Sequence, residues 1–145
     1  MTTPQLSETF QQLAFDIIFR GAEKPKRYLL GLVKDLPINP EKASIAAWES
    51  QEPVGAKGYK RVPMDPATWE VSEADSTTSN KGTFKNTGLT VHDSSWPQVT
   101  YSVMFAESKT GELTVVLWSS LRTARTLVPD DELVVVVPFD TKGGN

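Results

Sequence analysis

The chain has 145 residues, no cysteine and a formal net charge of −3 at pH 7. At this length we expect one domain, which buries about 68–70% of the surface that the unfolded chain exposes. The lack of cysteine excludes disulfides, zinc–thiolate sites and thiol catalysis, and the negative charge gives no electrostatic reason to expect nucleic acid or a membrane as a partner. No apolar run reaches the roughly 18 residues of a membrane span, and the first residues lack the features of a signal peptide, which predicts a soluble protein.

The first predicted element is an amphipathic helix over residues 7–21. Four apolar residues recur with helical spacing and should anchor the helix to the domain: Phe10, Leu13, Ile17 and Ile18. Ser7 is typical of an N-cap and Gly21 of a helix end. Phe15 and Phe19 lie beside this apolar stripe, so we expect the helix to contact more than one neighbour, including another chain.

Between residues 22 and 139, short apolar or alternating runs are separated by turn signals. The expected strands are 28–33, 59–62, 69–72, 82–86, 89–91, 99–105, 113–117, 123–128 and 133–139. A short helix is expected at 41–48 after Asn39-Pro40, and an exposed loop at 73–80. The pattern predicts a mainly β fold: a single antiparallel β-sandwich or barrel-like domain over 22–139, preceded by the helix and followed by a flexible tail over 140–145.

The central feature of this pattern is a hairpin over residues 96–120. Alternation places Val103 with Phe105, Val115 and Leu117 on one face, and places a second apolar set on the other: Met104, Ala106, Val116 and Trp118. Gly111 can adopt the positive φ that the connecting turn needs. Because both faces are apolar, the hairpin should lie in the middle of a sheet or sandwich.

Two further strands carry specific expectations. Gly31, inside the apolar run 28–33, predicts a bulge or a close approach of the backbone. The run 133–137 is apolar on both faces, so it should be central in its sheet or covered by a neighbour. Phe15 and Phe19 of the helix lie beside the stripe that should pack on the domain. Together with these residues, the run 133–137 predicts a homo-oligomer, either a dimer or a trimer.

Several segments follow one another in the order found in a known family. They are the helix end FRG (19–21), YLLGLV (28–33), GYKRVP (58–63), TSN (78–80), WPQVTY (96–101) and the turn KTG (109–111) before the strand at 113–118. This order resembles a family of small structural proteins of tailed bacteriophages, often labelled tail fibre proteins, which read FRG, YLGLF, GGGYAR, TSN, WGTVTHFGIF and LLFWG. The resemblance covers residues 7–139, with Tyr101-Ser102 where the family has His-Phe.

The resemblance implies a virion protein, assembled in the host cytoplasm, that binds other virion proteins rather than catalysing a reaction. We interpret it as a capsid-decorating (cement) protein that binds the major capsid protein and stabilises the shell. A projecting fibre needs repeats or heptads, and the chain has neither. The alternatives are a tail or tail-fibre-associated protein with a role in host attachment, and a small sugar-binding or hydrolase domain.

Few residues are candidates for chemistry. His92 is the only histidine, and neither a nucleophile elbow nor a separated triad accompanies it, so we interpret it as a turn residue. The acidic run 130–132 lacks the spacing of a calcium loop and is interpreted as a solvated turn. We therefore predict no catalytic residue, cofactor or metal site.

Basic and aromatic residues could instead serve binding. The basic residues lie in two groups: Lys24, Lys26 and Arg27, and Lys60 with Arg61. A net negative chain without interleaved aromatics makes us predict no nucleic-acid role for them, and no membrane role. Trp118 is expected in the core, whereas Trp48 and Trp69 are the better candidates for a surface or an interface.

Overall fold

The computed structural model describes residues 5–64, 69–72, 77–89 and 94–140. Two helices and eight strands make up the regular structure of this part of the chain. They are β1 (Gln5–Leu6), α1 (Glu8–Arg20), β2 (Arg27–Val33), α2 (Ile45–Glu49), β3 (Val62–Met64), β4 (Glu70–Ser72), β5 (Thr77–Lys85), β6 (Val99–Glu107), β7 (Leu113–Arg125) and β8 (Glu132–Asp140).

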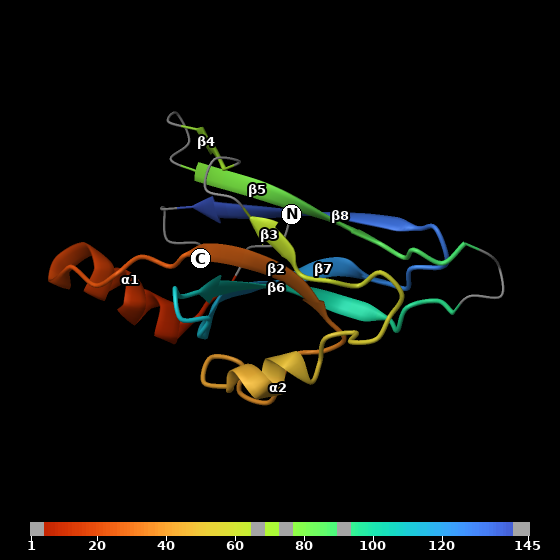
Figure 1. Cartoon of the computed structure of the whole chain (residues 1–145), viewed down its shortest axis with the longest axis horizontal. Helices are drawn as coiled ribbons and strands as arrows, with labels where there is room; N and C mark the ends of the chain where they lie inside the picture. The colour runs from red at the N-terminus through yellow and green to blue at the C-terminus, as the bar shows by residue number, and fades with distance from the viewer. Residues whose placement is uncertain (1–4, 65–68, 73–76, 90–93, 141–145) are drawn as a thin grey trace.

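The strands form two antiparallel sheets. The larger sheet has the order β1-β7-β6-β2-β3, and the smaller has the order β4-β5-β8. Figure 1 shows the two sheets as stacked layers, with α2 on the far side of the larger sheet and α1 at one end. The predicted mainly β fold is confirmed, and of the two forms expected, the described strands make the sandwich.

The main core lies between the two sheets. It is formed by buried apolar side chains of both layers and of two connecting segments: Leu30, Leu32, Met64, Phe84, Trp96, Val99, Met104, Ala106, Val116, Leu117, Leu127, Leu133, Val135 and Val137. Both sheets are therefore needed to remove this apolar surface from water, which is the dominant stabilising term in folding.

A second apolar cluster covers the opposite face of the larger sheet. Trp48 of α2 is fully buried there and lies against Trp118 of β7, with ring centroids 5.4 Å apart. The predicted core position of Trp118 is confirmed, and the surface position predicted for Trp48 is wrong. Helix α2 therefore covers an apolar face of the larger sheet, and the Trp48 side chain makes this contact.

The predicted hairpin is present, but its faces change partway along. The pairing of β6 with β7 shifts between Met104–Leu117 and Phe105–Val115, which leaves Val116 as an extra residue. Such a bulge breaks the period-two alternation. Leu117 consequently packs in the main core and Trp118 faces α2, the reverse of the predicted faces. Gly111 has the expected positive φ, 88°.

Other boundaries differ from those predicted. The strand expected at 59–62 is β3, which begins only at Val62, because Tyr59 makes side-chain contacts instead of pairing. Part of the loop expected at 73–80 belongs to β5, which pairs with β4 on one side and β8 on the other. The short helix begins at Ile45 because the side chain of Ser44 caps it. Leu89 lies outside the strands.

Helix α1 is attached at its N-terminal end. The Ser7 side chain caps the helix and donates to the backbone oxygen of Val115, and the Ser7 N–H donates to the oxygen of Val116 at 2.8 Å. Phe10 packs edge-on against Tyr28. No residue of α1 is buried, and Ile18, predicted to be an anchor, is 69% exposed. That prediction is wrong because the C-terminal end of α1 extends beyond the sheets (Figure 1).

Candidate functional site

The most elaborate polar arrangement lies at the edge of β2. Strand β3 pairs only with Tyr28–Leu30 of β2, so the second half of β2 has no strand neighbour on that side among the described residues. The side chain of Tyr59 takes the place of a strand there. Its hydroxyl oxygen accepts from the N–H of Leu32 at 3.1 Å and lies 3.4 Å from the Leu32 carbonyl oxygen.

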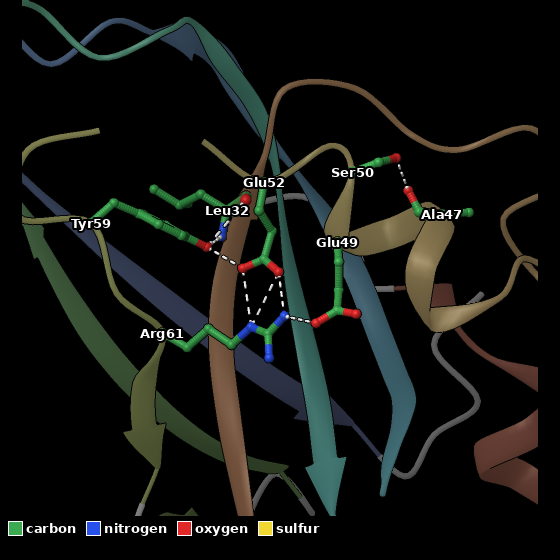
Figure 2. A network of polar contacts seen from close by, with 7 residues as sticks. All are labelled: Leu32, Ala47, Glu49, Ser50, Glu52, Tyr59 and Arg61. Atoms are coloured by element: carbon green, nitrogen blue, oxygen red, sulfur yellow. Dashed lines mark hydrogen bonds and ion pairs between the residues drawn. The ribbon is translucent and has the colours of Figure 1, made fainter. Parts of the chain in front are cut away.

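Glu52 is the centre of this arrangement, which Figure 2 shows. The Glu52 residue is 4% exposed, and its carboxylate accepts from the Tyr59 hydroxyl and from the Arg61 guanidinium, whose Nε lies 3.1 and 3.2 Å from the two carboxylate oxygens. Arg61 also pairs with Glu49 at 2.9 Å and lies over the ring of Phe105, 4.6 Å from its centroid. We call Glu49, Glu52, Tyr59 and Arg61 the β2-edge network.

Gly31 leaves the space that this network occupies. A Cβ atom at this position would lie 3.0 Å from the Tyr59 hydroxyl oxygen and 3.1 Å from Glu52 Oε2. The pairing of β2 with β6 is regular at Gly31, so the bulge is absent, and the close approach at this position is made by two side chains rather than by backbone.

The electrostatics of the β2-edge network favour a structural role. Burial, followed by the charge of Glu52, raises the pKa of Tyr59 far above its ordinary value. The hydrogen bond to Glu52 raises the pKa of Arg61 in the same direction. Tyr59 thus stays protonated and Arg61 stays charged near neutral pH, and neither can act as a base. What the network can do is hold the segment 49–61 against the sheet.

A second feature is an exposed apolar surface on α1. Phe15, Ile18 and Phe19 are 60%, 69% and 77% exposed, and the two phenylalanine rings lie 6.2 Å apart. We call these three residues the α1 outer face. The exposed residues Lys24 and Lys26 follow within a few positions of the helix end. The sequence places Phe15 and Phe19 beside the stripe that should pack on the domain, and the structure shows that Ile18 is exposed together with them.

The candidate chemical residues are not brought together. His92 lies outside the described residues. Of the acidic run 130–132, Asp130 and Asp131 lie in the predicted turn, whereas Glu132 begins β8 and pairs with Lys85; the Lys85 ammonium lies 3.2 Å from the Asp130 carboxylate and 3.8 Å from that of Glu132. The described ranges contain no group of three side chains placed to hold a metal ion.

The basic and aromatic candidates are also separated. Arg27 pairs with Glu107 at 2.7 Å, and Arg61 belongs to the β2-edge network rather than to an exposed basic patch. Trp69 is half-buried. No helix in the described part of the chain is long and apolar enough to cross a membrane.

One shallow hollow of about 190 Å³ lies between the N-terminal ends of α1 and α2. Its rim carries the hydroxyl groups of Ser7, Thr9, Ser44 and Thr114. The side chains of Ser7 and Ser44 are already used to cap the two helices. Two of these hydroxyl groups are therefore occupied by helix capping.

Comparisons with protein-family models, with curated proteins and with solved structures find no match to this chain.

Proposed function

We propose that the protein is a structural component of a tailed-phage virion that decorates the capsid by binding the major capsid protein, and that the α1 outer face is the contact. The order of segments over residues 7–139 supports membership of the virion. The charged groups of the β2-edge network are paired with one another, which supports action by binding rather than by catalysis.

The observation that carries the proposal is the α1 outer face itself. Three large apolar side chains lie next to one another in solvent on the outer side of a helix whose N-terminal end is hydrogen-bonded to β7. Exposed apolar groups that cluster in this way mark interaction sites. Three side chains of this size offer on the order of 400 Å², half of what each partner of a stable complex provides. Such a small contact suits the major capsid protein as a partner, because a shell presents the same binding surface many times.

The location can be tested on particles made from the genome that encodes the chain. Electron microscopy of particles with and without the protein should show extra density at regular positions on the shell. Density confined to the tail would replace the capsid role by the tail or host-attachment role. A protein that is missing from purified particles would contradict both.

Substitutions on α1 test the contact. We expect Phe15→Ser with Phe19→Ser to abolish binding of the purified protein to particles that lack it, with unfolding temperature little changed, because both rings are already in water. Ile38→Ser, at a residue that is 96% exposed elsewhere, is the matched control and should bind like the parent. Because the contact is apolar, binding should persist at about 0.5 M salt, where exposed charge pairs are screened. A double variant that still binds fully would rule out the α1 outer face.

A further inference from the structure

The longest open sheet edge in the described part of the chain belongs to β8. This strand pairs with β5 along its whole length, and no described strand lies on its other side. The sequence pattern predicts that this strand is central or covered by a neighbour, and among the described strands it is not central. An edge of this kind presents a row of backbone N–H and C=O groups to which another strand can pair.

The other edge strands of the two sheets are short, although β7 extends beyond β1 and β5 extends beyond β4. The edge strands β1, β3 and β4 have two, three and three residues. Beyond β3, the side chain of Tyr59 covers the open part of β2. Short edge strands and covering side chains are ways in which proteins prevent unwanted strand pairing. β8, by contrast, has nine residues, with four consecutive valines and no lysine.

Both faces of β8 are apolar at this edge. Leu133, Val135 and Val137 are buried in the main core, whereas Val134 and Val136 are each 53% exposed on the outer side. A strand added beside β8 would extend the main core on one face and cover the exposed valines on the other. Pro138, which has no N–H to donate, ends the stretch that can form a regular ladder.

We propose that β8 pairs with β8 of a second copy of this chain, antiparallel about a two-fold axis at Val134, which joins two three-stranded sheets into one of six strands. In this register Val134 faces its own copy, Leu133 faces Val135 of the second copy, and Glu132 faces Val136. Apolar side chains therefore face one another at the centre of the strand pair on both faces of the sheet, which stabilises the pairing.

The register follows from the residues at the two ends of the strand. Centring the pair on Glu132 would oppose two carboxylates, which is destabilising. Centring it on Val135 or Val136 would bring Pro138 opposite Glu132 or Val134 and remove a ladder hydrogen bond, and centring it on Leu133 would pair only residues 132–134 of the two strands. The axis at Val134 avoids these conflicts and pairs residues 132–136 of both strands, and this self-complementarity favours a second copy over an unrelated strand. The inference does not depend on the proposed function, because it is argued from β8 and not from the α1 outer face.

Cysteine cross-linking tests the pairing directly, because the chain contains no cysteine. Opposed residues of antiparallel strands have Cα atoms about 4.5–5.5 Å apart, within the range that a disulfide spans. We expect Val134→Cys to form a disulfide-linked dimer under mild oxidation. Val71→Cys, on β4 and 72% exposed, is the matched control and should remain monomeric on a non-reducing gel. Cross-linking that is stronger for Val136→Cys than for Val134→Cys would overturn the register.

Sedimentation measures the dimer without a covalent link. We expect the parent to be a dimer and Val134→Lys to be a monomer, because the substitution opposes two charges at the axis, whereas Val71→Lys should stay dimeric. If Val134→Lys fails to fold, the cysteine variant decides. A parent that is monomeric at millimolar concentration, or a folded Val134→Lys that remains a dimer, would overturn the proposal, including the case in which a different protein covers β8.

Discussion

Replacing Glu52 by Ala should destabilise the protein by about 3–5 kcal/mol, because it leaves the guanidinium of Arg61 without its main partner in a largely buried place. The Glu52 side chain is 2% exposed and that of Arg61 is 23% exposed. The substitution also removes the acceptor of the Tyr59 hydroxyl, which then loses its fixed position at the edge of β2. Chemical denaturation followed by tryptophan fluorescence measures the change in the free energy of unfolding.

Glu49 provides the matched control for this experiment. Its carboxylate pairs with the same guanidinium at 2.9 Å, but its side chain is 46% exposed. An ion pair in water contributes about 0–1 kcal/mol, so Glu49→Ala should cost no more than that. Equal losses for Glu49→Ala and Glu52→Ala would show that burial does not set the importance of the β2-edge network.

The sequence predicts those parts of the fold in which the pattern repeats. The hairpin of β6 and β7, the strand β2 and the caps of α1 follow from alternation, from apolar runs and from residues such as Ser7 and Gly21. These signals are local, because each depends on residues within a few positions of one another. They identify the elements correctly, but the bulge at Val116 shows that alternation alone does not assign every residue of β7 to its face.

Features that depend on distant contacts are not visible in the pattern. The spacing of Glu52, Tyr59 and Arg61 within a loop has no periodicity, and the glycine at position 31 is the one local sign that something approaches β2. The burial of Trp48 depends on which sheet face α2 covers. The exposure of Ile18 depends on where the sheet ends beneath α1, which no residue of the helix encodes.

The loop that carries the β2-edge network contains a second sensitive position. Gly58 has φ +83°, and a Cβ atom there would lie 2.6 Å from Oγ1 of Thr87 and 2.8 Å from the backbone oxygen of Lys85. Little room can be made, because the carbonyl of Lys57 accepts hydrogen bonds from the N–H of Thr87 and from the indole N–H of Trp96. Any movement of this loop would break contacts to the main core.

Gly58→Ala should therefore destabilise the protein by about 2–5 kcal/mol. A left-handed backbone costs a non-glycine residue about 1–2 kcal/mol, and overpacking adds about 1–3 kcal/mol. Gly55→Ala separates the two contributions, because Gly55 has a similar φ, +87°, and no atom within 4 Å of the added Cβ. We expect the control to lose only the backbone part in thermal unfolding followed by circular dichroism. If both variants lose the same stability, the approach of the loop to Thr87 and Lys85 is not a constraint on the fold.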